Sequence, residues 1–452
     1  MNSSRLIRLL LLVADIVSTV VVFELVNYSR GLPGHLSISA LMLPAALLIL
    51  GIYLIDGYRI RTDVRTIDYT SSHIIAIVIT MLVMLLLTFI LIPAGYELQE
   101  SRVVIVFSFL ALIVPTLGVR RLLHRQLSAV SSGRSLLYLG DRAGRADFRR
   151  ECAKMGVRQP VLYSSFGPAD DAEPGEVLRP LEEVLRDISE GRLSAGAIVL
   201  RESSRELSPA TAERLVDLYF RGIPTYTLEL FHQIYWQKIP LYRLNSTWLF
   251  QEGFQIAREP VFERLKRTTD IVFSVVGLAL CGPFIGVLAL LIWLEDRGPA
   301  FFRQYRIGKN QVPFQVLKLR TMRIGSSSGN RYTQPNDKRI TRIGRLLRAS
   351  RLDELPQLWN VLKGEMSLIG PRAEWDRLAE EYQRQIPCYN YRHLVRPGIT
   401  GWAQVNFTYG ASLDDTLMKL EYDLYYIRHF SFILDASIFL KTIQVILFGK
   451  GR

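Results

Sequence analysis

The chain has 452 residues, 49% of them hydrophobic and 21% charged, and its net charge at pH 7 is +13. This length exceeds one ordinary hydrophobic core and predicts about two to four domains. The three cysteines lie far apart and form no CxxC pair, which argues against a disulfide scaffold or a zinc site and favours a reducing compartment.

Four long apolar segments occupy the first part of the chain, at residues 6–26, 36–55, 74–94 and 103–123. Each has about the 20 residues that a helix needs to cross the hydrocarbon core of a bilayer. We therefore predict four transmembrane helices in a first domain that covers residues 1–126.

The short loops indicate an orientation, because arginines gather on one side of the predicted spans. They precede the first span, separate the second from the third and follow the fourth: Arg5, Arg8, Arg59, Arg61, Arg65, Arg120, Arg121 and Arg125. The positive-inside rule then places the amino terminus and everything after residue 123 in the cytoplasm. Asp15 and Glu24 fall within or near the end of the first span, and we interpret them as packing or interface groups rather than as a conduction path.

Residues 134–253 form a second region, in which short apolar runs alternate with amphipathic stretches. The runs predict buried strands at 135–140, 195–200 and 223–228, and the stretch at 209–222 predicts a helix. Strand and helix alternation is typical of a parallel sheet, so we predict a Rossmann-like middle domain.

The first turn of this middle domain, LGDRAGRADF, starts like a dinucleotide-binding motif at Gly140. Arg142 and Arg145 stand where the later glycines of GxGxxG belong, and side chains there would block the close approach of a pyrophosphate. We therefore predict a degenerate domain used for regulation or self-association.

A fifth apolar segment, residues 271–294, is long enough to span a membrane and contains no charged residue. Both flanks are basic, with Arg264, Lys266 and Arg267 before the segment and Arg297, Arg303 and Arg306 after it. The positive-inside rule places both ends in the cytoplasm, and Pro283 in the middle can bend a helix. We predict a re-entrant helix-break-helix hairpin over residues 268–295, with a fifth full span as the alternative.

A basic amphipathic helix is predicted around residues 340–348, where apolar residues at helical spacing alternate with arginines. Such a helix suits a membrane surface. Nucleic acid is the rival partner for the positive charge, but no aromatic platform or DNA-binding module accompanies the helix, so we expect no nucleic acid partner.

Asp353 and Glu354 follow this helix and precede Pro356, which predicts the start of the next helix. Acids at such a position are usually caps. The surrounding Arg348, Lys363 and Arg372 could instead hold phosphate and keep a carboxylate ionised, which favours a reaction centre. The sequence pattern alone leaves both interpretations open, and one residue could serve both.

At these residues the chain resembles the bacterial sugar transferase family, the monotopic polyprenyl-phosphate hexose-1-phosphate transferases. The resemblance covers residues 262–448 through LKRTTD, the proline-broken hairpin, RQYRIGKNQVPFQVLKLRTM, LDELPQLWNVLKGEMSLIGPR and RPGITGWAQVN, in that order. It implies a catalytic domain over residues 262–452 with amphipathic interfacial helices. The whole chain then resembles the larger members, which initiate exopolysaccharide or O-antigen synthesis as multi-pass proteins of the bacterial inner membrane, with the catalytic domain in the cytoplasm.

The resemblance implies a two-step transfer of a sugar-1-phosphate from a UDP-sugar to undecaprenyl phosphate, with release of UMP. Asp353 would be the nucleophile and Glu354 the ligand of Mg²⁺. Contacts with phosphate or nucleotide are implied for Lys318, Arg320, Arg348, Arg372 and Arg396. Anchoring at the membrane interface is implied for Lys266, Arg267, Asp270 and Pro283.

After GWAQVN the chain departs from the commonest family pattern, with FTYGASLDDTLMKLEYDLYYIRHFS in place of a Gly-Arg-Asn opening. This stretch resembles a subgroup found with exosortase-linked polysaccharide clusters, and it leaves the identity of the sugar open. We interpret Asp414, Asp415 and Asp423 as caps or surface residues, and the apolar run at 430–448 as interfacial.

Two rival functions remain. The first is direct transfer in a ternary complex, in which the carboxylates only hold metal. The second is a non-catalytic membrane scaffold or regulator of a polysaccharide assembly complex. The sequence leaves the oligomeric state open, with a homodimer as one candidate.

Overall fold

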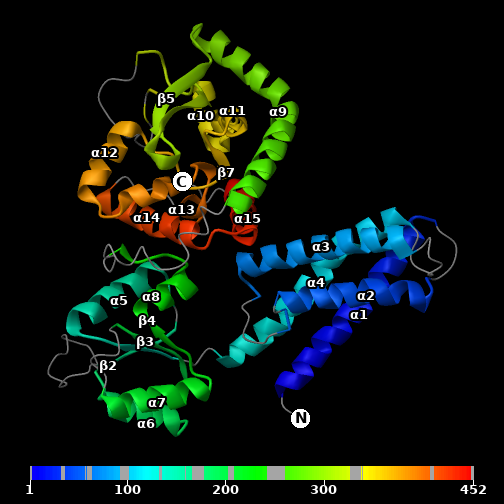
Figure 1. Ribbon diagram of the computed structural model, residues 1–452, viewed down its shortest axis with the longest axis vertical. Helices are drawn as coiled ribbons and strands as arrows, with labels where there is room; N and C mark the ends of the chain where they lie inside the picture. Colours follow the sequence, from blue (N-terminus) through cyan, green and yellow to red (C-terminus); the bar gives the residue numbers. More distant parts are fainter. Residues whose placement is uncertain are drawn as a thin grey trace. The chain divides into compact units, whose positions relative to one another are not determined.

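The structure is a computed structural model of the chain. It describes residues 3–31, 36–55, 57–58, 64–91, 101–131, 135–157, 159–164, 178–201, 208–241, 260–325, 337, 339–407 and 412–448. They fall into two compact units, Met1–Arg134 and Ser135–Arg452 (Figure 1).

The first unit consists of four apolar helices, as the sequence predicts: α1 (Ser3–Ser29), α2 (Ile38–Leu54), α3 (Ile67–Leu91) and α4 (Arg102–Ser131). Helices α1, α3 and α4 are long and apolar enough to cross a membrane. Helix α2 has 17 residues, at the short end of the range for a spanning helix. The chain is therefore a membrane protein. The loop arginines Arg59 and Arg61 lie outside the described residues.

A buried ion pair lies inside this unit. Both terminal nitrogens of Arg120 in α4 donate to the Asp15 carboxylate in α1, at 2.8 and 2.6 Å, and the Tyr58 hydroxyl donates to the same carboxylate at 2.5 Å. Glu24 accepts a hydrogen bond from the backbone N–H of Leu36 at 2.9 Å. Both acids therefore serve packing, as predicted.

The middle region is a parallel sheet of four strands in the order β2-β1-β3-β4. The strands are β1 (Ser135–Leu139), β2 (Val161–Ser164), β3 (Ala195–Leu200) and β4 (Thr225–Thr227). The helices are α5 (Arg142–Lys154), α6 (Leu181–Ser189), α7 (Pro209–Phe220), α8 (Leu228–Phe231) and the π-helical turn η2 (His232–Trp236). The three predicted strands and the predicted helix are confirmed, while β2, α5 and α6 lack a sequence prediction.

Alternate residues of β1 point to opposite faces of this sheet. Leu136 and Tyr138 pack with Phe148 of α5 and with α8, whereas Leu137 and Leu139 pack with α6 and α7. Helices thus cover both faces, which explains why the central strands β1 and β3 are apolar along almost their whole length.

Two arginines fill the turn between β1 and α5. Arg145 is 1% exposed and donates to the Gly140 carbonyl at 3.0 Å, while Arg201 forms an ion pair with Asp141. Arg201 also lies against Gly144, where an added Cβ would come within 2.3 Å of its Cδ. This packing is in keeping with a turn that does not hold a pyrophosphate.

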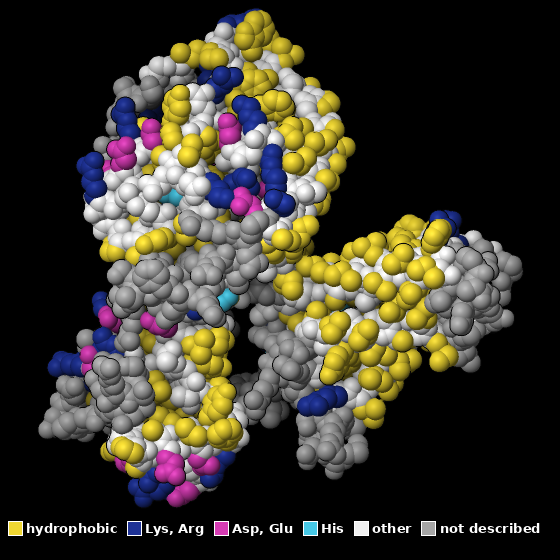
Figure 2. Space-filling view, viewed as in Figure 1, with side chains coloured by type: hydrophobic (Ala, Val, Ile, Leu, Met, Phe, Trp, Pro, Cys, Tyr) yellow, Lys and Arg dark blue, Asp and Glu magenta, His cyan; other side chains and the backbone are white. Residues whose placement is uncertain are grey.

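Helix α9 (Pro260–Asp296) contains the fifth apolar segment as one continuous helix of 37 residues. The predicted break in the helical backbone is therefore wrong, because Pro283 lies inside the helix. A proline removes one backbone hydrogen bond and bends a helix without ending it, and α9 follows a bent course in Figure 1. Its apolar side chains are widely exposed (Figure 2). Phe273, for example, is 62% exposed and Leu280 75%.

The remaining elements pack into the last part of the second unit. They include the antiparallel pair β5 (Phe301–Ile307) and β6 (Pro313–Leu319), joined by η6 (Lys309–Gln311), and the parallel pair β7 (Ser367–Ile369) and β8 (Gly398–Thr400). The helices are α10 (Arg342–Ser350), η7 (Leu352–Glu354), α11 (Gln357–Lys363), α12 (Asp376–Gln385), η8 (Tyr389–Leu394), α13 (Trp402–Asn406), α14 (Leu413–Arg428) and α15 (Phe432–Phe448).

The three aspartates of α14 have three different environments. Asp415 completes a capping box with Ser412 at the start of α14, and Asp414 is exposed beside it, as predicted. Asp423 is 1% exposed and forms an ion pair with Arg392 at 2.8 Å, so the prediction of a cap or surface role is wrong for this residue. Asp423 lies on the buried face of α14. The sequence pattern of this helix does not show which of its faces is buried.

The Asp15–Arg120 pair yields a stability prediction. Asp15→Asn is expected to lower the free energy of unfolding by about 3–5 kcal/mol, because it leaves the Arg120 guanidinium buried without a counter-charge. The double variant with Arg120→Gln should recover most of this loss. Denaturant titration of the full chain in detergent measures both, with the exposed Arg8→Gln as a control. Equal losses for the single and double variants would contradict the assignment.

Candidate active site

The predicted acid pair lies in a single turn of 3-10 helix between two α-helices. Arg351 ends α10 in a left-handed conformation (φ 58°), η7 holds Asp353 and Glu354, and α11 begins after Pro356. Neither acid caps α11, whose N-cap is Pro356 without a side-chain hydrogen bond. The predicted capping role is therefore wrong, because the intervening turn places the acids ahead of the helix.

Glu354 is held by two cations. Lys318 of β6 donates to its Oε1 at 2.7 Å, and the Nη1 of Arg372 lies 3.8 Å from the same oxygen. Burial alone would raise the pKa of Glu354, but the charges of Lys318 and Arg372 outweigh it and lower the pKa to about 2. Glu354 is therefore a permanently ionised carboxylate at neutral pH.

Asp353 has the opposite electrostatic balance. Its side chain is 9% exposed, and burial raises its pKa, a shift that the nearby Lys318 and Arg348 oppose and the charge of Glu354 reinforces. The neighbouring cations therefore favour the ionised form of both acids, but at Asp353 the effect of burial outweighs them and the pKa is raised. Two adjacent carboxylates with pKa values moved in opposite directions suit different chemical roles.

Arg348 reaches the site because α10 packs tightly on the end of β6. Its Nε donates to the Thr321 hydroxyl at 2.8 Å, and the Thr321 carbonyl accepts the Thr341 N–H at 3.0 Å. A Cβ on Gly344 would lie 2.2 Å from this carbonyl oxygen, so only glycine permits the approach. Thr321 and Gly344 thus place Arg348 near Asp353.

Asn360 fixes α11 against β6. Its Oδ1 accepts the Leu317 N–H at 2.9 Å and its Nδ2 donates to the Gln315 carbonyl at 2.7 Å, on the strand that carries Lys318. Helix α9 also packs on α11, since a Cβ on Gly277 of α9 would lie 3.1 Å from Cδ1 of Leu358 in α11. Sequence reasoning missed Asn360 and Thr321, and their places inside the LWN and LRTM motifs were the available signal.

The membrane-interface residues of the prediction lie around α9 and the far end of α11. Arg267 donates to the carbonyls of Val361 and Leu362 at 2.5 and 2.6 Å. These carbonyls lie in the last turn of α11, where the helix has no N–H group four residues further on to bond with them. Asp270 accepts from the Ser367 hydroxyl at 3.1 Å and from the Leu368 N–H at 3.0 Å. These bonds attach the first half of α9 to the folded body.

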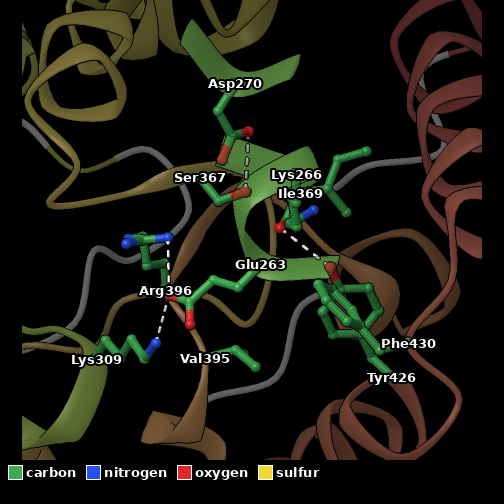
Figure 3. A pocket seen from close by; sticks show the side chains of 10 residues that line it. All are labelled: Glu263, Lys266, Asp270, Lys309, Ser367, Ile369, Val395, Arg396, Tyr426 and Phe430. Carbon is green, nitrogen blue, oxygen red and sulfur yellow. Dashed lines mark hydrogen bonds and ion pairs between the residues drawn. The ribbon is translucent and has the colours of Figure 1, made fainter. Parts of the chain in front are cut away.

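Lys266 and Arg396 line a small cavity near the first turns of α9 (Figure 3). Lys266 donates to Asp435 of α15 at 2.5 Å, and Arg396 donates to the Gly364 carbonyl at 3.1 Å and pairs with Glu263 at 3.2 Å. The cavity measures about 20 Å³, which is room for one water molecule and not for a nucleotide. Arg396 thus lies at the opposite end of α11 from Asp353 and is not brought together with it.

Arg320 forms an ion pair with Asp296 at the last residue of α9. It is 7% exposed, and its guanidinium lies over Gly298, where an added Cβ would come within 2.1 Å of Nη1. Both ends of α9 are therefore attached to one folded body, through Asp270 and Asp296. The structure brings together Lys318, Arg348, Arg372, Asp353 and Glu354, and it places Arg320 at the end of the apolar helix.

These features define a membrane protein with a buried acid pair among lysine and arginine side chains, and comparison with known proteins gives its family. The bacterial sugar transferase family matches residues 261–449. The chain belongs to this family.

Three relatives illustrate the similarity. A UDP-N-acetylgalactosamine-undecaprenyl-phosphate N-acetylgalactosaminephosphotransferase of Aeromonas hydrophila is 48% identical over 193 residues, 42% of this chain and 46% of the relative. A UDP-glucose:undecaprenyl-phosphate glucose-1-phosphate transferase of Caulobacter vibrioides is 43% identical over 185 residues, 40% of this chain and 69% of the relative. An exopolysaccharide production protein PSS of Rhizobium leguminosarum bv. phaseoli is 41% identical over 195 residues, 41% of this chain and 98% of the relative. The match thus spans less than half of the Aeromonas protein and nearly all of the Rhizobium protein.

The lowered pKa of Glu354 predicts a pH-dependent contribution to stability. A folded pKa of about 2, against an ordinary value of 4.5, contributes stability above pH 4.5 that is lost as the pH falls toward 2. Glu354→Gln should therefore lower the free energy of unfolding at pH 6 by about 3 kcal/mol, since one pKa unit corresponds to about 1.4 kcal/mol. At pH 2 the variant and the wild type should be equally stable.

Denaturant unfolding of the full chain in detergent at several pH values measures this difference. The control is Glu182→Gln, whose side chain is 56% exposed in an ion pair with Arg214 and should matter little at any pH. A gap between wild type and Glu354→Gln that stays constant from pH 6 to pH 2 would show that Glu354 is not the titrating group.

Proposed function

We propose that this protein transfers a sugar-1-phosphate from a UDP-sugar to undecaprenyl phosphate through a covalent intermediate on Asp353, releasing UMP. The observation that carries the proposal is the acid pair of η7, in which one carboxylate is firmly ionised and the other has a raised pKa beside Lys318 and Arg348. The names of the relatives support the substrate class, since they include undecaprenyl-phosphate sugar phosphotransferases for glucose and for N-acetylgalactosamine.

The first step is a displacement at phosphorus. A carboxylate oxygen of Asp353 attacks the phosphorus that bears the sugar, the bond from that phosphorus to the bridging oxygen breaks, and UMP leaves with the electron pair. The raised pKa of Asp353 makes its ionised form a better nucleophile than an ordinary aspartate. Arg348 and Arg372 stand where cations can balance the charge of the transferring phosphoryl group.

The second step regenerates the enzyme. An oxygen of undecaprenyl phosphate attacks the same phosphorus, the bond to the Asp353 oxygen breaks, and a lipid-linked diphosphosugar forms. Covalent catalysis of this kind divides one difficult displacement into two easier ones.

Glu354 is the residue that would hold Mg²⁺. Lys318 and Arg372 approach the carboxylate at Oε1, and Mg²⁺ usually takes one or two carboxylates together with substrate phosphates. Among the residues that the structure describes, no group of three or more His, Cys, Asp or Glu forms a cage for a metal, which fits a site completed by substrate. When bound, the ion supplies positive charge against the pyrophosphate oxygens.

The re-entrant arrangement of α9 belongs to this proposal. A fully crossing helix would carry the chain to the other side of the bilayer, whereas both ends of α9 bind the same folded body through Asp270 and Asp296. A bent helix with exposed apolar residues can enter one leaflet and leave the acid pair at the cytoplasmic surface, where UDP-sugars and the lipid phosphate meet. We propose the bacterial inner membrane as the location and exopolysaccharide or O-antigen initiation as the pathway step.

UMP release tests the reaction and the donor together. Detergent-solubilised wild type and Asp353→Asn are assayed with Mg²⁺, undecaprenyl phosphate and a panel that includes UDP-glucose and UDP-N-acetylgalactosamine. The wild type should release UMP with at least one donor, and Asp353→Asn should lose about 1,000-fold or more in rate, because no other group replaces the nucleophile. Activity of Asp353→Asn within tenfold of wild type would exclude Asp353 as the nucleophile, and a folded wild type inactive with every donor would favour the scaffold function.

A further inference from the structure

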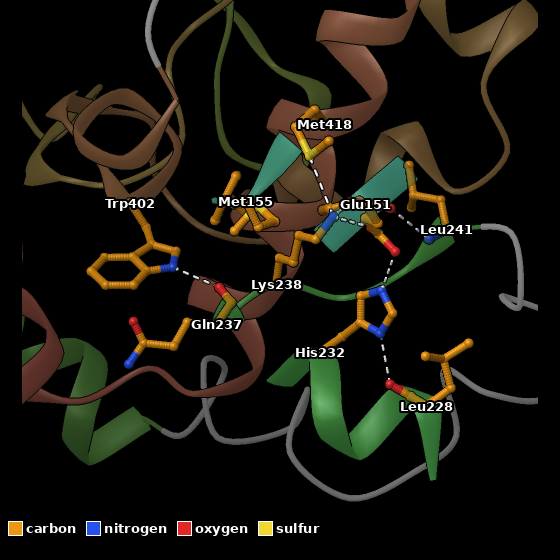
Figure 4. Close-up of polar contacts among 11 residues, drawn as sticks. Glu151, Met155, Leu228, His232, Gln237, Lys238, Leu241, Trp402 and Met418 are labelled. Atoms are coloured by element: carbon orange, nitrogen blue, oxygen red, sulfur yellow. Dashed lines mark hydrogen bonds and ion pairs between the residues drawn. The ribbon is translucent and has the colours of Figure 1, made fainter. Parts of the chain in front are cut away.

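A buried lysine joins the middle sheet region to the last helices of the chain. Lys238 is 0% exposed, and its ammonium group donates to Glu421 of α14 at 3.0 Å. The same group donates to Glu151 of α5 (Figure 4). His232 holds the second oxygen of Glu151 through its Nε2 at 2.7 Å. Breaking such a buried pair leaves an uncompensated charge, so the contact strongly resists separation.

The residues on either side of Lys238 contact α13 and α14 through their backbones. We call residues 232–241 the interdomain strap. Ile239 donates its N–H to the Glu421 carbonyl at 3.0 Å, and Leu241 donates its N–H to the Glu421 carboxylate at 3.2 Å. Gln237 adopts a left-handed conformation (φ 51°), and its carbonyl accepts the indole N–H of Trp402 at 2.9 Å.

Trp402 connects the strap to the acid pair. It is 1% exposed, begins α13, and carries the Lys441 ammonium over its ring at 4.0 Å. The preceding Gly401 approaches Gly370 so closely that an added Cβ would lie 2.0 Å from the Gly370 carbonyl oxygen.

Gly370 lies two residues before Arg372, which is the second positively charged residue near the Glu354 carboxylate. Gly398 of β8 donates its N–H to the Pro371 carbonyl at 2.9 Å and pairs with Arg372 as a bridge. The chain of contacts therefore runs from the strap through Trp402 and Gly370 to Arg372, which lies 3.8 Å from Glu354.

We propose that Lys238 and Trp402 are positioning residues, through which the interdomain strap holds Arg372 on the acid pair. The middle domain would then set the activity of the site through packing rather than through a nucleotide of its own. This proposal rests on the proposed function for its kinetic readout, but its structural readout is independent of it.

Hydrogen exchange of the full chain in detergent tests the structural part. Lys238→Met should speed exchange of backbone amides in residues 366–373 and 398–406 as well as in the strap. Trp402→Phe keeps an aromatic ring but removes the indole N–H that reaches Gln237, and it provides a milder second variant if Lys238→Met does not fold. The matched control is Leu185→Ala on the opposite face of the sheet, where Leu185 is 0% exposed, and it should speed exchange only within the middle domain.

The kinetic part measures UMP release by the same variants. Lys238→Met and Trp402→Phe should lower kcat about 10-fold or more with little change in KM for the donor, since misplacing a charge near the reacting phosphorus mainly affects the transition state. Leu185→Ala should keep the wild-type kcat at temperatures below its unfolding.

Two results would overturn the proposal: unchanged exchange at 366–373 with wild-type kcat in both strap variants, or Leu185→Ala matching Lys238→Met in both readouts. If wild type releases no UMP, the proposed function fails by itself and the exchange data alone decide the role of the strap.

Discussion

The candidate site depends on one ion pair, in which Lys318 balances the negative charge of the buried Glu354 carboxylate. Glu354 could not stay ionised at 11% exposure without Lys318, so β6, which carries the lysine, and η7, which carries the acid, must lie together. Asn360 fixes α11 to β6, and Gly344 lets α10 close on Thr321. The acid pair, the arginines and the apolar helix α9 are thus parts of one packed arrangement.

Much of the architecture could be predicted from the sequence, because it follows from hydrophobic periodicity. The four apolar helices, the strands β1, β3 and β4 and the basic helix α10 are all expressed in local patterns. The environment of the acids could not be predicted. The 3-10 turn that separates them from α11, the raised pKa of Asp353 and the burial of Asp423 all depend on residues distant in sequence. The continuity of α9 through Pro283 was missed because a proline marks a bend but does not say whether the helix ends there.

The cations that the sequence assigns to one site lie at different places in the structure. Lys318, Arg348 and Arg372 meet the acid pair, as their motifs suggest, whereas Arg396 and Arg320 bind Gly364 and Asp296 at other places in the fold. Arg267 and Asp270 hold α9 against α11 and β7, so the apolar helix and the candidate site are attached to the same elements. In the reaction that we propose, this arrangement would let a water-soluble donor and a lipid acceptor reach the same carboxylate.

The covalent mechanism is tested most directly by the mass of the protein after incubation with an accepted UDP-sugar in the absence of undecaprenyl phosphate. A covalent intermediate predicts an increase by one phosphosugar, mapped to the peptide that contains Asp353 and discharged when the lipid is added. Failure to form any adduct, with UMP released only when donor and lipid are both present, would contradict the covalent mechanism and favour direct transfer in a ternary complex.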